Sequence, residues 1–365
     1  MGATLQTVAD EVGVSRSTVS NAYSRPDQLS PELRARILAA AERLGYAGPN
    51  PTARSLRRGK VDAIGVLLTA NLTQAFRDPY AVEYLRGLAE VAERRQTSLL
   101  LIPIPPHDPE GALKAVRNAA VDAFCLYCVP DWHGVLGVIA ARGLPVVAGD
   151  DPEIVANGMV HGDGIPVGFV GIDDREAARK LAAHVAALGH RRVALVVHWA
   201  SEDGATGPVD LAPEDLRYTV SGERTRGFRD AITAAGGSWD DVLLINAAEN
   251  DRAVGAEAAA HALDRLDRST AIMATSDVLA LGILDALATR GLRAGRDVSV
   301  TGFDDIPEAE RAGLTTIRQP SAERGRITGQ LLLDPPADPS DRRRVLPTTL
   351  MVRASTGPNN KKEAS

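Results

Sequence analysis

The sequence predicts an all-α head of three helices with a short hinge helix, joined to an α/β body of two Rossmann-like lobes. Helical periodicity dominates the first 46 residues, whereas from Val61 onward apolar strand-like runs alternate with amphipathic helices. Residues 1–60 contain nine Lys or Arg and five Asp or Glu, a net charge of +4, whereas the rest of the 365-residue chain carries −10. A basic head on an acidic body indicates that only the head meets a polyanion.

The first 25 residues predict a helix, a tight turn and a second helix. The first helix ends at Gly13, and Ser15 is suited to cap the next one. The stretch VSRSTVSNAY, residues 14–23, then exposes short hydrogen-bonding side chains, namely Arg16, Ser17 and Asn21. A helix-turn-helix presents this part of its second helix to base edges in the major groove. The alternative is a solvated helix of an ordinary three-helix bundle.

A third helix is expected within LSPELRARILAAAERLGY, residues 29–46. Ser30 is suited to the N-cap, Pro31 to the first helical position and Gly45 to the end of the helix. The residues expected to face inward are Leu33, Ile37, Ala41 and Leu44. This helix completes a domain over residues 1–48.

Residues 49–60 are expected to form a hinge. Asn50 can cap and Pro51 can begin a helix of less than two turns, which is too short to be stable alone in water. Its arginines suit phosphates, and Leu56 could be a wedge that separates two base pairs in the minor groove. A plain basic linker is the alternative.

The body, residues 61–356, contains two successive series of strands and helices. The expected strands are AIGVLL, SLLLIP, DAFCLYC, LPVVAG and GFVGI in the first series, and RRVALVV, DVLLIN, TAIMAT and DVSVTGF in the second. Two lobes follow, with a ligand-binding cleft between them. We assign about 61–173 and 306–332 to the first lobe, about 174–305 and 333–356 to the second, and 357–365 to a disordered tail.

Other functional classes find little support in the sequence. It lacks the GxxxxGK[ST], HExxH and GxSxG motifs, and its seven histidines show no ligand spacing, so we expect no catalytic, metal or cofactor site. Cys125 and Cys128 form a CxxC within an apolar strand, for which a structural role is the favoured interpretation. Neither a signal peptide nor a membrane-spanning segment is evident, so we expect a cytoplasmic protein with no membrane partner.

The segments 4–46 and NPTARSL, residues 50–56, resemble the DNA-binding head and hinge of the LacI/GalR family of bacterial transcription regulators. The resemblance implies base contacts by Arg16, Ser17 and Asn21, phosphate contacts by Thr4, Ser15 and Thr18, and hinge contacts with DNA by Asn50, Ala53, Leu56 and Arg57. Leu56 matches the intercalating leucine of that family.

The body also resembles the effector-binding core of this family, which has a type I periplasmic-binding-protein-like fold. Matching strings are LGHRRVALV, ERTRGF, ATSDVLALG, DVSVTGFDDIP and LTTIRQP. The candidate effector-binding residues are Phe76, Asp173, Arg224 and Asp277. Arg224 and Asp277 match effector positions of the family, although each alone is more often a cap or a salt-bridge residue. The loops 69–80, 151–168 and 200–221 are longer than in familiar relatives. Pocket residues within these loops therefore cannot be assigned by matching them to positions in the family.

We expect the protein to be a transcriptional regulator that binds operator DNA as a homodimer, and a repressor is the favoured type. A sugar or a nucleoside-like effector in the cleft would control operator binding. The sequence specifies neither the identity of this effector nor whether it acts as an inducer or as a corepressor. The alternatives are a cytoplasmic small-ligand-binding protein and a hydrolase, each without regulatory DNA binding.

Overall fold

The computed structural model describes residues 2–50, 55, 58–69, 72–104, 108–129, 134–149, 167–200, 204–216, 218–264 and 270–359. The chain divides into two compact units, Met1–Asp62 and Ala63–Ser365. Within the described ranges, no helix combines the length and the apolar character that crossing a membrane requires.

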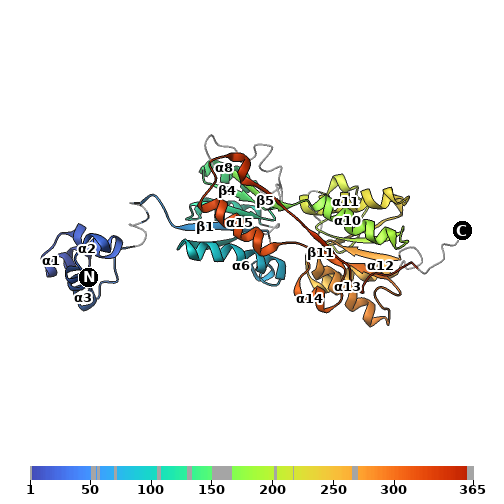
Figure 1. Ribbon diagram of the computed structural model, residues 1–365, viewed down its shortest axis with the longest axis horizontal. Coiled ribbons are helices and arrows are strands. Elements are labelled where there is room, and N and C mark those ends of the chain that lie inside the picture. Colours follow the sequence, from blue (N-terminus) through green and yellow to red (C-terminus); the bar gives the residue numbers. More distant parts are fainter. Residues whose placement is uncertain are drawn as a thin grey trace. The chain divides into compact units, whose positions relative to one another are not determined.

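The first unit contains α1 (Leu5–Val12), α2 (Arg16–Ser24), a 3-10 turn (Pro26–Gln28) and α3 (Pro31–Arg43), as Figure 1 shows. The predicted caps are confirmed, because Ser15 accepts a hydrogen bond from the Thr18 amide and Ser30 from the Leu33 amide. A core of small and branched side chains joins the three helices, with Val8, Val19 and Ile37 fully buried.

The inward orientation predicted for Leu44 is wrong, because its side chain is 39% exposed. Helix α3 ends at Arg43, and the chain reverses at Gly45, whose φ is +67°, so Leu44 leaves the inward stripe of the helix. Tyr46 packs on the core instead, edge-on to Tyr23 with 6.1 Å between ring centroids.

The first lobe of the body is built on a six-stranded parallel sheet with the order β12-β5-β4-β3-β1-β2. Its strands are β1 (Ala63–Leu68), β2 (Ser98–Pro103), β3 (Ala123–Tyr127), β4 (Val146–Ala148), β5 (Val167–Ile172) and β12 (Arg343–Leu346). Successive side chains of a strand point to opposite faces, so Val66 packs toward α6 (Pro79–Arg94) and α15 (Ser321–Leu333). Leu67 packs toward α7 (Pro109–Asn118) and α8 (Val135–Arg142) on the other face. A short helix, α5 (Leu72–Ala75), follows β1.

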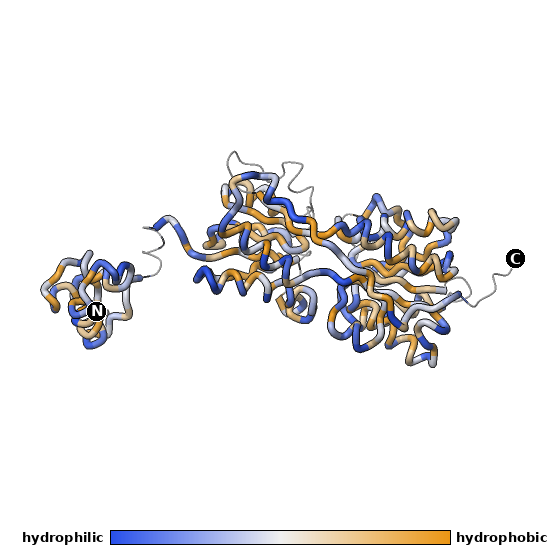
Figure 2. The backbone as a smooth tube through the Cα atoms, viewed as in Figure 1, coloured by the Kyte–Doolittle hydropathy of each residue, from blue (hydrophilic) through white to orange (hydrophobic). Residues whose placement is uncertain are grey.

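The second lobe repeats this design with the strand order β10-β9-β6-β8-β7. The strands are β6 (Val193–His198), β7 (Gly207–Pro208), β8 (Leu243–Ala247), β9 (Ala271–Ala274) and β10 (Ser299–Thr301), all parallel except β7. The helices are α10 (Asp174–Ala187), α11 (Thr219–Ala234), α12 (Arg252–Leu263), α13 (Asp277–Thr289) and the short α14 (Pro307–Arg311). Figure 2 shows the strands of both sheets as mostly hydrophobic segments between helices of mixed hydropathy. The predicted α/β body with parallel sheets is therefore confirmed.

Three connections join the lobes: β5 to α10, β11 (Thr316–Arg318) to α15, and β12 to β13 (Thr349–Met351). β11 and β13 pair as a separate antiparallel ribbon. The second lobe was predicted to contain all of 333–356, but β12 pairs with β5 in the first sheet. The return to the first lobe was predicted at 306, but the Ile306 amide bonds to Asp277 in the second lobe, so the return follows β11.

The C-terminal segment also differs from its prediction. Residues 357–359, expected to be disordered, are held on the second lobe. The Asn359 amide donates to the Leu188 carbonyl at 2.8 Å, and His190 lies 2.9 Å from the Gly357 carbonyl oxygen. Hydrogen bonds with the folded lobe therefore extend its boundary past Thr356, and residues 360–365 lie outside the described part of the chain.

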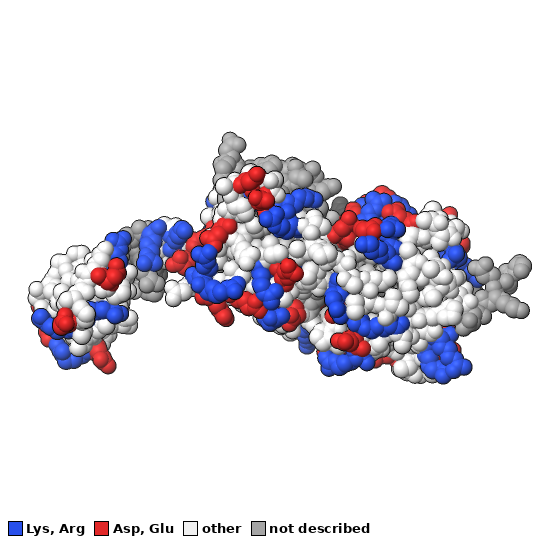
Figure 3. Space-filling view, in the orientation of Figure 1, with Lys and Arg blue, Asp and Glu red and all other residues white. Residues whose placement is uncertain are grey.

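The surface of the body carries both signs of charge. On the face shown in Figure 3, basic and acidic side chains are interspersed and form no continuous basic field. Many belong to ion pairs within one helix, such as Arg86 with Glu83 and Arg179 with Glu176, both at 2.6 Å. This face of the body is therefore not suited to a polyanion.

Helices α6 and α15 approach so closely that their contact requires glycine. A Cβ atom at Gly325 would collide with the Tyr84 carbonyl oxygen, and one at Gly87 would collide with the Ala322 carbonyl. Gly137 in α8 is also helical and has no atom within 4 Å of an added Cβ. The two kinds of helical glycine therefore respond differently to substitution.

We expect Gly325→Ala to lower the free energy of unfolding by about 1–3 kcal/mol, because the two helix backbones must separate. Gly137→Ala should raise the free energy of unfolding by about 0.5–1 kcal/mol, because alanine restricts the unfolded chain without a clash. Urea titrations followed by circular dichroism measure both changes. Equal effects of the two substitutions would contradict the tight helix contact.

Candidate functional site

The exposed start of α2 is the candidate DNA-reading surface of the first unit. Arg16 and Ser17 occupy the first two helical positions with exposed side chains, and the half-buried Asn21 follows one turn later. The Asn21 side-chain amide makes a long contact of 3.4 Å with Gln28. These three side chains lie on one helix, so they can follow one groove.

Hydroxyl groups surround the N-termini of the first two helices. Thr4 caps α1 in a capping box with Thr7. The Ser15 hydroxyl caps α2, accepting from the Thr18 amide at 3.1 Å, and lies within hydrogen-bonding distance of the Ser17 and Thr18 hydroxyls. Helix N-termini favour anions because of their unpaired amides and their dipole. The predicted phosphate-contact residues therefore lie where a phosphate would be stabilised.

The hinge residues are only partly described. Asn50 is exposed and follows the head, whereas the predicted contacts Ala53, Leu56 and Arg57 lie outside the described residues.

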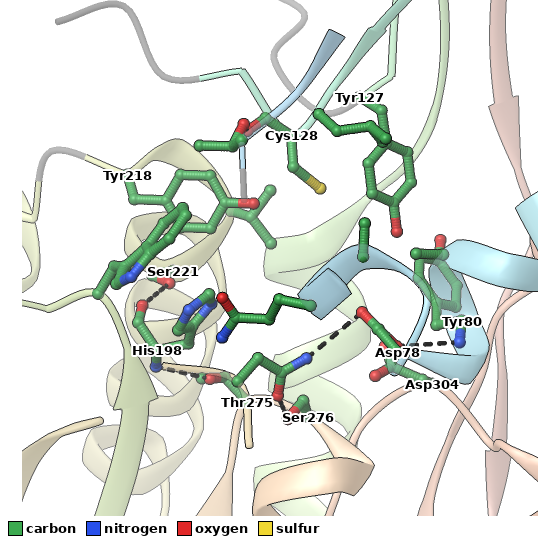
Figure 4. Close-up of a pocket in the computed structure, with 18 of the residues that line it drawn as sticks. Asp78, Tyr80, Tyr127, Cys128, His198, Tyr218, Ser221, Thr275, Ser276 and Asp304 are labelled. Atoms are coloured by element: carbon green, nitrogen blue, oxygen red, sulfur yellow. Dashed lines mark hydrogen bonds between the residues drawn. The ribbon is translucent and has the colours of Figure 1, made fainter. Parts of the chain in front are cut away.

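The body contains a cavity between its lobes with about 910 Å³ of empty space, including its open mouth. The first lobe lines it mainly with Thr69, Gln74, Asp78, Tyr80, Tyr127 and Cys128, and the second with His198, Trp199, Tyr218, Ser221, Arg224, Asn250, Thr275, Ser276 and Asp304. Figure 4 shows His198 and Tyr218 on one side of the cavity and Asp78, Tyr80 and Asp304 on the opposite side. The volume suits a small molecule.

One wall of the cavity is aromatic. The rings of His198 and Trp199 stack with 4.3 Å between their centroids, and Tyr218 packs edge-on to both. The Trp199 indole donates to the Ala248 carbonyl at 2.9 Å, which fixes its orientation. Burial, together with the charge of Arg224, lowers the pKa of His198 to about 3, so the imidazole is neutral near pH 7.

Arg224 is the cation among the described residues that line the cavity. Its guanidinium donates to Asp174 at 2.7 Å and to the Thr275 carbonyl at 2.5 Å, and it lies 3.9 Å from Asp304. It also stacks on the Phe303 ring, 3.8 Å from the centroid. Burial alone would lower the pKa of Arg224, but the two carboxylates raise it, so the cation persists in the buried site.

Polar side chains from the two lobes meet across the cavity. Asp78 accepts from the Tyr80 amide at 3.0 Å and from the Asn250 side chain at 3.4 Å, and Asn250 accepts in turn from Ser276 at 2.5 Å. Gln74 donates to Glu249 at 2.9 Å, again from one lobe to the other. Burial raises the pKa of Asp78. These contacts hold the lobes together around the cavity.

Of the four candidate effector residues, the structure brings Arg224 to the cavity wall and leaves three outside it. Phe76 is 57% exposed just beyond α5, and Asp173 caps α10 by accepting from the Glu176 amide. The Asp277 carboxylate is fully buried and accepts from the Thr316 hydroxyl at 2.6 Å and the Ile306 amide at 2.9 Å. Asp277 therefore links structural elements of the second lobe, because its oxygens face Thr316 and Ile306 and do not line the cavity.

Sequence reasoning missed most of the cavity wall. Asp304 could have been found, because it follows β10 in the string DVSVTGFDDIP just as Asp277 follows β9. Trp199 and Tyr218 come from segments between a strand and a helix, and Tyr80 from the first turn of α6, and no short motif indicates that these side chains line the cavity. The CxxC cysteines are not joined by a disulfide: Cys125 is buried in β3 beside the Tyr84 hydroxyl, and Cys128 lines the cavity.

Comparisons with known proteins agree with this two-part organisation. A family model described as bacterial regulatory proteins of the lacI family matches residues 4–50. A model described as a periplasmic binding protein-like domain matches residues 182–356. An HTH-type transcriptional regulator of Mycolicibacterium smegmatis is 41% identical over 363 residues, which cover 98% of this chain and 97% of the relative.

Solved structures resemble the chain over nearly its full length. The crystal structure of a LacI family transcriptional regulator from Corynebacterium glutamicum has a TM-score of 0.72 and 34% identity, covering 96% of this chain and 98% of the other. A complex of the transcriptional regulator CelR with cellobiose has a TM-score of 0.66 and 27% identity, covering 97% and 99%.

The buried Asp277 should leave a signature in the pH dependence of stability. Burial, assisted by the charge of Asp305, raises the pKa of Asp277 to about 7, so the folded chain keeps a proton that the unfolded chain, with a pKa near 3.9, releases. This contribution to stability is complete below about pH 4 and is lost as the pH rises through 7. Asp277→Asn, which cannot ionise, should therefore reduce the decline of the unfolding free energy between these pH values.

Urea titrations at several pH values measure this slope. Asp285→Asn is the control on the same helix, because Asp285 pairs with Arg252 at the surface and its pKa is lowered. Its loss should not reduce the decline. Superimposable pH profiles of the Asp277→Asn variant and the unaltered protein would refute the assignment.

Proposed function

The chain belongs to the LacI family of bacterial regulatory proteins, and on this premise we propose that it is a repressor whose operator binding is controlled by a small molecule held between its lobes. As a family member it is a DNA-binding regulator of transcription and not an enzyme. One observation carries the proposal: a single chain combines an exposed helix-turn-helix surface with a cavity lined from two lobes. We propose that it acts in the cytoplasm, where operator DNA is accessible.

The DNA contacts divide into two kinds. Arg16, Ser17 and Asn21 contact base edges, since arginine suits guanine and asparagine suits adenine. Thr4, Ser15 and Thr18 contact phosphates at helix N-termini, which fixes the position of the head on the duplex. The proposed hinge contacts are Asn50, Ala53, Leu56 and Arg57, with Leu56 as a minor-groove wedge.

We propose that the regulator acts as a homodimer on an inverted-repeat operator. One short recognition helix covers too few base pairs for specificity, and two-fold symmetry doubles the recognised site.

The cavity favours an uncharged, polyhydroxylated ring as effector. The wall of His198 and Trp199 suits the apolar face of a sugar or a cyclic polyol, and Asp78, Asp304 and Asn250 suit hydroxyl groups. In the described lining, the cation Arg224 already pairs with Asp174 at 2.7 Å, so little of its charge is left to attract a phosphate group. The CelR structure holds cellobiose, a neutral sugar, which agrees with this class.

The proposed position of the effector, between the two lobes, allows it to control operator binding. A molecule that contacts both walls changes the relative stability of lobe arrangements, and it controls operator binding if those arrangements hold the hinges differently.

The base contacts can be separated from general DNA affinity. Asn21→Ala should weaken binding to the selected operator by about 1–3 kcal/mol and change binding to random duplex little. The salt dependence should stay the same, because asparagine neutralises no phosphate. Binding titrations on both duplexes across salt concentrations measure these quantities. Equal weakening on both duplexes would make the exposed face of α2 a phosphate contact only.

The effector class can be tested by thermal denaturation of the full chain. Neutral monosaccharides, cellobiose and cyclic polyols should include compounds that raise the melting temperature, whereas their phosphorylated counterparts should not. Trp199→Leu should weaken an active compound by about 1–2 kcal/mol through loss of the stacking wall. Trp239→Leu, outside the cavity, is the matched control. Stabilisation by phosphorylated sugars or by nucleosides alone would overturn the proposed class.

A further inference from the structure

A continuous chain of buried hydrogen bonds passes behind the cavity. Arg324 donates to the Tyr80 hydroxyl, which donates to the side-chain oxygen of Gln319 at 2.9 Å. The side-chain amide nitrogen of Gln319 donates to Asp304 at 2.7 Å. All four residues are at most 7% exposed. The contacts are therefore largely shielded from bulk water.

The donor-to-acceptor direction of these hydrogen bonds is fixed at the end occupied by the Arg324 cation. A guanidinium can only donate, so the Tyr80 oxygen accepts from Arg324, and its own proton points to the oxygen of Gln319. This leaves the amide NH₂ of Gln319 facing Asp304, which accepts through a carboxyl oxygen. The bonds consequently run head to tail from a cation to a carboxyl group, an arrangement in which each bond strengthens the next.

The four residues belong to different parts of the body. Arg324 on α15 and Tyr80 on α6 belong to the first lobe, and Asp304 follows β10 in the second. Gln319 lies between β11 and α15, where the chain passes from one lobe to the other. One side chain at a connection therefore bonds to both lobes.

The series of hydrogen bonds also reaches the cavity. Tyr80 and Asp304 line it, and Figure 4 shows both on the same side. Asp304 lies 3.9 Å from Arg224, the cation of the cavity wall. A rotation of the lobes that separates Tyr80 from Asp304 must break a bond to Gln319 and leave a buried polar atom without a partner.

We propose that Gln319 is a positioning residue that couples the two lobes, holding the Tyr80 hydroxyl and the Asp304 carboxylate in the arrangement that closes the cavity. Its regulatory role rests on the proposed function, because lobe arrangement matters to operator binding only if an effector acts through it. Gln319 itself need not touch the effector, since it acts through Tyr80 and Asp304.

The lobe arrangement can be measured without effector or DNA, which separates this proposal from the proposed function. Spin labels on unnatural amino acids at the exposed positions Lys114 on α7 and Glu257 on α12 report the interlobe distance in the full chain by pulsed electron paramagnetic resonance. At pH 8, Gln319→Glu replaces the amide that donates to Asp304 by a second carboxyl group and should shift the distances away from the closed population. Gln330→Glu, on the exposed surface of α15, is the matched control and should keep that population.

A compensating change distinguishes coupling from a general loss of packing. In the double variant Gln319→Glu with Asp304→Asn, the carboxylate and the amide exchange places, so the amide of residue 304 donates to residue 319 while Tyr80 still donates to it. We expect the closed population to return. Tyr80→Phe, which removes the hydroxyl between Arg324 and Gln319, should shift the distances as Gln319→Glu does.

Three results would overturn the proposal. One is a Gln319→Glu variant whose distances match those of the unaltered protein, and another is a double variant that stays as open as the single one. If Gln319→Glu fails to fold, Tyr80→Phe decides: unchanged distances in that folded variant contradict the coupling. A failure of effector control with these distance changes present would count against the proposed function alone.

Discussion

The buried guanidinium of Arg224 holds together the part of the cavity wall that the second lobe contributes. It bonds to Asp174, the first residue of α10 after one interlobe connection, and faces Asp304, close to the next. It also holds the end of β9 through the Thr275 carbonyl. Removing one partner from such a set would leave a buried charge uncompensated, which is costly. The cation therefore joins the cavity wall to residues next to the segments that connect the lobes.

The neighbouring carboxylate Asp305 extends the same principle to the remaining connection. Its side chain is 4% exposed and pairs at 2.6 Å with Arg318 on β11 and with Arg353 beyond β13. Asp305 adopts a φ of +59°, an uncommon conformation that these two pairs help to maintain. Adjacent carboxylates thus face different ways, Asp304 toward the cavity and Asp305 toward the ribbon between the lobes. Two adjacent residues therefore contact the ribbon and the cavity.

Local patterns predicted the elements of this protein better than the site. Helix caps such as Ser15 and Ser30 depend on neighbours in the sequence, and apolar runs mark the strands, so both could be inferred directly. The assignment of β12 to a lobe depends on long-range pairing with β5, which no local signal encodes. Asp277 and Asp304 each follow a strand of the second sheet, yet one faces Thr316 and the other the cavity. Side-chain direction after a strand is set by tertiary packing, so the sequence pattern could not show that Asp304 lines the cavity and Asp277 does not.

The central claim is that the occupant of the cavity and the operator influence each other through the lobes. The most direct measurement uses the neutral polyhydroxylated compound that stabilises the full chain most, and determines the operator dissociation constant with and without it. The compound's own dissociation constant is then measured with and without operator. The account predicts that both change by the same factor, about 5- to 150-fold, because coupling between two sites is reciprocal. An operator dissociation constant that stays the same when the cavity is saturated would contradict it.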